Sequence, residues 1–144
     1  MNRLVICTAL AMAFFFSRHA QRPAVPVAPE VVAVPSLAKY RSKMTVDDRT
    51  ALAQCYEILA KSVAANPVDD PVIPSVPALC DVHRAALLFV WRGVLGNEPG
   101  KYEGLREELE GLVKTAVGDA DVPLNPAVQR DAATLFTNIA RSLR

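Results

Sequence analysis

The side chains best suited to chemistry in this chain are two cysteines and a histidine. Cys80 and His83 stand three positions apart, so a helix would place the thiol and the imidazole on one face. Such a pair could work as a nucleophile with its base, and Cys55 could serve as a redox partner or a third metal ligand. Structural zinc usually has four protein ligands, and the only other histidine is His19 in the N-terminal segment. We therefore predict no metal and no cofactor, and keep a small redox or thiol enzyme using Cys55, Cys80 and His83 as an alternative function.

Cys55 and Cys80 are also the candidate disulfide. In an exported protein they would meet an oxidising compartment, where two cysteines in one domain fit a single bridge. The bridge would enclose 24 residues and add roughly 3 kcal/mol of stability. Both cysteines also fall in apolar helical stripes, where thiols pack as small hydrophobic groups. The bridged and the unbridged pair both stay open, and we expect His83 to be capped or half-exposed near a helix start.

Acidic residues offer a second kind of chemistry. Asp119 and Asp121 resemble the start of a calcium loop, but the glycine and the final glutamate of that loop are missing. Four glutamates between residues 103 and 110 are interleaved with Arg106 and followed by Lys114. We interpret the first feature as a polar turn and the second as a solvated helix face, and we predict no catalytic residue.

The chain begins with a hydrophobic targeting segment. Residues 4–16 are uncharged and follow Arg3, the arrangement typical of a secretory signal. As a helix this run would rise roughly 20 Å, less than the hydrocarbon core of about 30 Å. Arg18 and Arg22 occupy positions where cleavage requires small residues. Residues 1–20 are thus a signal peptide or an uncleaved signal-anchor, and the alternative is a buried helix of a cytosolic protein.

A proline-rich linker is expected next, over residues 21–40. Four prolines fall between Pro23 and Pro35, too densely for a helix or a central strand. The intervening residues are mostly valine and alanine, which favours an extended spacer over a docking ligand. With the anchor retained, the protein would be membrane-tethered through residues 4–16; with it removed, it would be exported. Both alternatives predict the cell envelope as its location.

Residues 41–144 predict an all-α domain, resembling a small four-helix bundle. Helical periodicity covers 45–65, 77–95, 101–117 and 126–142, with no convincing strand. Thr45 is the expected N-cap of the first helix, and Asn125 with Pro126 that of the last. The predicted buried residues of the first, third and fourth helices are Leu52, Cys55, Tyr56, Leu59, Val63; Tyr102, Leu105, Leu109, Leu112, Val113, Ala116; and Val128, Ala132, Leu135, Phe136, Ile139, Leu143.

The segment 77–95 is apolar on almost every side in its second half. A helix of this kind is usually buried, so we expect it to be the central helix with the others around it. The long loop 66–77 should lie against the core. Gly104 and Gly111 stand seven apart on one predicted helix, which indicates the close approach of another helix, within the fold or from a second molecule.

Charge excludes one class of function. Residues 1–40 carry four basic residues and one acidic residue, and residues 41–144 carry twelve basic and fourteen acidic residues. Nucleic-acid binding requires a concentrated basic face, which is missing from this sequence. We therefore predict no nucleic-acid partner.

The predicted contact surface is the turn between the second and third helices. It is formed by Trp91, Asn97, Glu98, Lys101 and Tyr102, although Trp91 is better explained as a core residue. The favoured function is an exported or membrane-tethered helical module with a non-enzymatic role in structure or protein interaction, through a protein partner or self-association. Besides the thiol enzyme, the alternative is an accessory structural protein of a virus or mobile element.

Overall fold

A computed structural model describes residues 33–96, 98 and 100–144 of the chain. These residues form helices, with no named strand among them, which confirms the all-α prediction. In chain order the elements are η2 (Pro35–Leu37), α2 (Ala38–Arg41), α3 (Val46–Ala64), α4 (Val76–Gly93), α5 (Leu105–Val117) and α6 (Pro126–Leu143). The predicted targeting segment, residues 1–20, lies outside the described residues. Among the helices that the structure describes, none has the length and apolar character needed to span a membrane.

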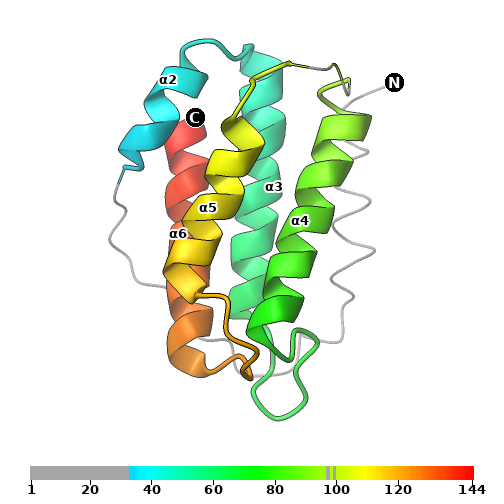
Figure 1. Cartoon of the computed structure of the whole chain (residues 1–144), viewed down its shortest axis with the longest axis vertical. Helices are drawn as coiled ribbons and strands as arrows, with labels where there is room; N and C mark the ends of the chain where they lie inside the picture. Colours follow the sequence, from blue (N-terminus) through cyan, green and yellow to red (C-terminus); the bar gives the residue numbers. More distant parts are fainter. Residues whose placement is uncertain (1–32, 97, 99) are drawn as a thin grey trace.

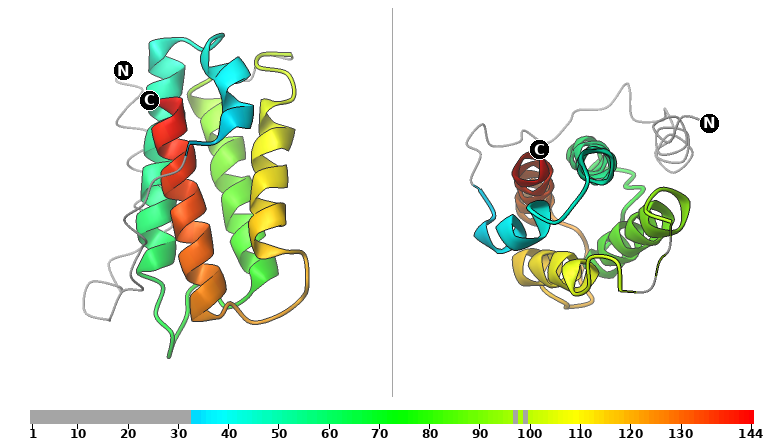
Figure 2. Two further views of the ribbon diagram at one scale, coloured as in Figure 1. Left: turned by 90° about the vertical axis from the view of Figure 1, so that its left-hand side faces the viewer. Right: turned by 90° about the horizontal axis from the view of Figure 1, so that it is seen from above.

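The four long helices stand side by side, each antiparallel to the next along the chain (Figure 1). Seen from above, α3, α4, α5 and α6 follow one another around a common core, so that α6 returns to lie beside α3 (Figure 2). Helices α3 and α6 share by far the most extensive contact. Both bury several alanines, and small side chains let helix backbones approach closely. These alanines are Ala51, Ala53, Ala60 and Ala64 of α3, and Ala132, Ala133 and Ala140 of α6.

The prediction that segment 77–95 is the central helix is wrong. Helix α4 buries a single stripe, while Leu88 and Phe89 on its flanks are only half-buried. The members of the stripe are Val76, Leu79, His83, Leu87, Val90 and Trp91. Helix α3 buries more residues than any other helix described, and its contact with α6 is the most extensive of the fold. The apolar character of α4 misleads because a half-buried flank also tolerates Leu and Phe.

The predicted helix starts at Thr45 and Asn125 are confirmed. The Thr45 hydroxyl accepts a hydrogen bond from the Asp48 amide, and the Asn125 side chain accepts one from the Val128 amide. The third helix starts at Leu105 instead of Lys101. Tyr102 and Gly104 both have positive φ, 54° and 83°, and a left-handed backbone cannot continue an α-helix.

A short N-terminal lead packs across the end of the helices. Leu37 of η2 is fully buried, and the amide of Val34 donates to the Ser142 hydroxyl of α6 at 2.8 Å. Gly104 allows this lead to come close, since a Cβ there would lie 2.9 Å from the Tyr40 hydroxyl. The expected close approach thus occurs within the fold at Gly104, whereas the expectation of one within the fold is wrong for Gly111, where a Cβ would meet no atom of the described residues within 4 Å. The packed region includes residues that the sequence assigns to the 21–40 linker.

Two buried amides organise the opposite end of the molecule. The Asn66 side chain accepts from the amides of Val72 and Ile73 and donates to the Ile73 carbonyl, which closes the proline-rich loop on itself. Gln129 of α6 donates to the carbonyls of Val63 and Asn66, at 2.7 and 2.8 Å. Val63 is in the last turn of α3 and Asn66 follows shortly after it, at the end where a helix lacks internal partners for its carbonyls. Gln129 therefore caps α3 from a distant part of the chain.

We predict that Asn66→Ala destabilises the protein by about 3 kcal/mol, because it orphans buried backbone donors and an acceptor in the loop. The free energy of unfolding in urea measures this loss. Asp69→Ala is the matched control, since Asp69 is exposed in the same loop. Equal stability of the two variants would contradict the role assigned to Asn66.

Candidate functional site

Four of the five predicted contact residues meet around one hollow beside the α4–α5 turn. We call it the turn hollow; it has a volume of about 450 Å³. Its lining residues are Trp91, Glu98, Gly100, Lys101, Tyr102, Glu103, Gly104, Arg106 and Glu107. Trp91 is only 7% exposed, so it belongs mainly to the core and contributes little accessible surface to the hollow. The fifth predicted residue, Asn97, lies outside the described residues.

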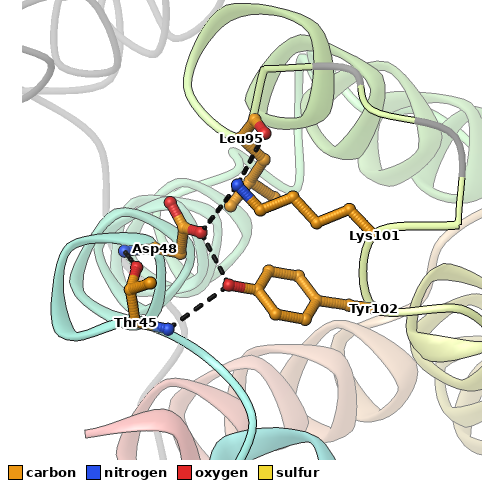
Figure 3. A network of polar contacts seen from close by, with 5 residues as sticks. All are labelled: Thr45, Asp48, Leu95, Lys101 and Tyr102. Atoms are coloured by element: carbon orange, nitrogen blue, oxygen red, sulfur yellow. Dashed lines mark hydrogen bonds and ion pairs between the residues drawn. The ribbon is translucent and has the colours of Figure 1, made fainter.

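A buried carboxylate holds this turn in place. Asp48, in the first turn of α3, is 1% exposed and receives the Tyr102 hydroxyl at 2.7 Å and the Lys101 ammonium at 3.2 Å on the same oxygen (Figure 3). Lys101 also donates to the Leu95 carbonyl at 3.0 Å, and the Thr45 amide donates to the Tyr102 hydroxyl at 3.3 Å. We call these contacts the Asp48 clamp. The clamp joins both sides of the turn to the start of α3.

The clamp changes the acidity of both donors. Its bond to Asp48 raises the pKa of Lys101, and burial together with the bond to Asp48 raises the pKa of Tyr102. Lys101 and Tyr102 therefore remain protonated donors throughout the neutral range. Asp48 is not among the site residues predicted from the sequence, since an acid at this position can equally be a solvated first-turn residue. No sequence signal separates the two roles, because an acid in the first turn already suits the helix dipole.

We predict that Asp48→Ala lowers the free energy of unfolding at pH 7 by about 3 kcal/mol, because Lys101 and Tyr102 lose the partner that they share. Asp47→Ala is the matched control, because Asp47 is exposed in the same helical turn. Urea denaturation of the two variants and the wild type gives the comparison. A loss no larger than that of the control would contradict the clamp.

The same experiment has a definite pH dependence. The raised pKa values of Lys101 and Tyr102 mean that the clamp contributes fully below the ordinary values near 10. Its contribution is lost as the pH rises through the raised values. We expect the stability difference between wild type and Asp48→Ala to shrink above about pH 10. A difference that stays constant into strong alkali would be inconsistent with this assignment.

The second candidate site is a groove between α4 and α5, with a volume of about 330 Å³. We call it the α4–α5 groove. Its lining residues include Cys80, Asp81, His83, Arg84, Glu110 and Lys114. The charges on its walls are largely matched: Arg84 pairs with Asp81 at 3.2 Å and reaches Glu110 at 4.0 Å, and Lys114 pairs with Asp119. The pairs are exposed, so each adds little to stability.

The thiol and the imidazole share this groove but are not prepared for catalysis. Burial is the main cause that raises the pKa of Cys80, so its thiol stays protonated near neutral pH. His83 is 2% exposed, and its Nε2 lies 2.7 Å from the Tyr56 hydroxyl. This contact occupies one of the two ring nitrogens that could act as a general base. The expectation that His83 is half-exposed is therefore wrong: it is a core residue.

His83 belongs to a buried aromatic cluster that joins three helices. Its ring stacks on Phe136 of α6, with centroids 5.6 Å apart and planes at 19°, and Tyr56 of α3 is tilted against both rings. Burial, with a smaller effect of Arg84, lowers the pKa of His83 to about 4. The pKa of Tyr56 is raised, again chiefly by burial. The Tyr56 hydroxyl and the Nε2 of neutral His83 share one hydrogen bond, and the tautomer of the ring sets which of the two is the donor.

The structure does not form the candidate disulfide. Cys55 and Cys80 are both thiols: Cys55 is 8% exposed within the core on α3, whereas Cys80 is half-exposed and lines the α4–α5 groove. A bridge needs Cβ atoms directed at each other, whereas Cys80 lines a groove that is walled by α4 and α5. Among the described residues there is also no cluster of three or more potential metal ligands.

A Cys7→Ser variant retains only the thiols of Cys55 and Cys80. We predict that a thiol reagent in native buffer without reductant adds one label to this variant. Cys80 should react because it lines the groove, and Cys55 should react only after denaturation because it is buried. Intact mass counts the labels, and peptide mapping assigns them. Two labels that appear only after reduction would establish the Cys55–Cys80 bridge and refute this prediction.

The fold and these sites define a small all-α protein with a clamped interhelical turn and a buried aromatic cluster. Comparison with family models, curated proteins and solved structures finds no match for the chain. Its function is therefore argued from its own residues.

Proposed function

We propose that this protein is a non-enzymatic helical interaction module of the cell envelope, and that the turn hollow contacts its protein partner. The observation that carries the proposal is the meeting of Trp91, Glu98, Lys101 and Tyr102 around one hollow. Binding residues are often found on loops that a rigid scaffold positions. The Asp48 clamp supplies such a scaffold here, because it anchors the turn to the first turn of α3.

The charge of the turn hollow favours a partner with a basic contact surface. Lys101 is committed to Asp48 and to the Leu95 carbonyl, so its charge is already matched inside the fold. The remaining charged residues around the hollow are Glu98, Glu103 and Glu107 against Arg106. This excess of carboxylates would steer a basic surface towards the hollow and repel an acidic one. A loop that is fixed before binding also loses less entropy when a partner arrives.

The alternative of a thiol enzyme has weaker support. Cys80 and His83 share a groove, but the raised pKa of Cys80 disfavours the thiolate, and the Nε2 of His83 is occupied by Tyr56. A nucleophile of this type needs a base within hydrogen-bond reach of its thiol. The groups of the α4–α5 groove therefore favour packing over catalysis.

A photo-crosslinking amino acid at position 103 in the native host tests the contact surface. Glu103 is exposed on the rim of the turn hollow, and Asp131, exposed on α6 and outside the lining of the hollow, is the matched control position. We expect a discrete crosslinked species from position 103 and not from 131, and we expect Asp48→Ala to weaken it. A species of twice the chain mass would identify self-association. The same products from both positions, or none from either, would overturn the proposed contact surface.

Fractionation of the same host tests the location, with intact mass as the readout. A full-length chain in the membrane fraction is expected for the signal-anchor, and a chain that lacks about the first twenty residues is expected for a cleaved signal. A full-length chain in the soluble fraction would overturn the assignment to the cell envelope.

A further inference from the structure

The role of His83 is left unexplained by the proposed function. It lies in the middle of the one buried stripe that attaches α4 to the rest of the fold. The other members of that stripe are apolar, so His83 alone among them can change its charge. Its partners come from two other helices: Tyr56 of α3 through a hydrogen bond of 2.7 Å, and Phe136 of α6 through a stacked ring.

We propose that His83 is an acid-sensitive latch, and that protonation of its imidazole releases α4 while α3 and α6 stay packed together. The inference concerns the helices themselves and does not depend on the turn hollow. Neutral His83 shares a hydrogen bond with the Tyr56 hydroxyl through Nε2. Once the ring is protonated, both of its nitrogens are donors, so Tyr56 can only accept, and a positive charge would be buried between aromatic rings.

The surrounding charges do not stabilise the imidazolium in its present position. On α4 itself, the adjacent Arg84 disfavours a second positive charge. On α6, the contact is the uncharged ring of Phe136. The titratable groups that contact His83 or line the same groove are Tyr56 on α3, Cys80, Asp81 and Arg84 on α4, Glu110 and Lys114 on α5, and Asp119 after α5; Cys55 is the chain neighbour of Tyr56.

The α4–α5 groove is the space that would receive the charged ring of His83. His83 forms part of its wall, and the carboxylates of Asp81, Glu110 and Asp119 line the same groove. A movement of α4 that brings the ring into the groove would hydrate the imidazolium and bring it nearer to those carboxylates. Release of α4 therefore exposes the charge to water. It also keeps the most extensive contact of the fold, between α3 and α6, intact.

The pH range follows from the shift of His83. Its pKa is about 4 in the folded state, against an ordinary value near 6.5. The closed state thus binds no proton between these values, whereas a released α4 binds one. The opening constant should rise about tenfold for each pH unit from 6.5 down to 4, and then level off. Above pH 6.5 the latch contributes its full stability.

Hydrogen exchange of the full chain, measured for each helix by mass spectrometry between pH 7 and 3.5, tests the latch. After correction for intrinsic exchange, α4 amides should be less protected than those of α3 and α6 at pH 6.5. Their protection should then fall about tenfold per pH unit down to about pH 4. Equal protection in all helices would mean that only global unfolding exposes His83, and would overturn the release of α4.

Two variants test whether His83 is the group that takes up the proton. His83→Gln keeps an acceptor for Tyr56 but cannot titrate, and it should abolish the pH dependence of α4. His19→Gln removes the only other histidine and should leave it unchanged. A dependence that survives in His83→Gln would overturn the proposal. Should His83→Gln fail to fold, the ¹⁵N shifts of the His83 ring in the wild type decide. A ring already protonated in the closed state well above pH 4 would also overturn it.

Discussion

Helix α3 carries buried polar groups at its start, in its middle and at its end, and each of them must find a partner on another element. The Asp48 carboxylate takes Lys101 and Tyr102, the Tyr56 hydroxyl takes His83, and the last carbonyls take Gln129. A buried polar group without a partner destabilises the fold by more free energy than most surface contacts contribute to its stability. These three requirements fix the α4–α5 turn, α4 and α6 relative to one helix, while apolar packing fills the space between them.

The helices and most of their apolar faces are predictable because spacing alone determines them, although Ala116, which is predicted to be buried, is exposed. Leu52, Tyr56, Leu59 and Val63 recur at helical intervals, and they are buried as predicted. The start of α5 is not predictable in the same way. Tyr102 is a non-glycine residue in the left-handed region, and nothing in the local sequence marks it. Its conformation follows from the hydroxyl's bond to Asp48, 54 residues away in the chain.

For the candidate sites too, spacing in the sequence predicts some features, and only tertiary contacts decide the others. The spacing of the apolar residues predicts a turn between the helices 77–95 and 101–117, and the lining of the turn hollow includes four of the five contact residues predicted there. The sequence could not show that Lys101 points inward to Asp48. The predicted exposure of His83 is wrong because a histidine near a helix start is usually accessible. Only the tertiary position of Tyr56 and Phe136 makes it a core residue.

The pairing of α3 with α6 also has a consequence for the order in which the chain acquires its structure. These two helices form the most extensive contact, yet Gln129 reaches Val63 across 66 positions of sequence. Contacts of such separation form slowly, because a long loop must close before they can contribute. During synthesis α3, α4 and α5 leave the ribosome before α6 is complete. The C-terminal helix thus sets the moment at which the core can consolidate, and until then α3 exposes its alanine-rich face to other proteins.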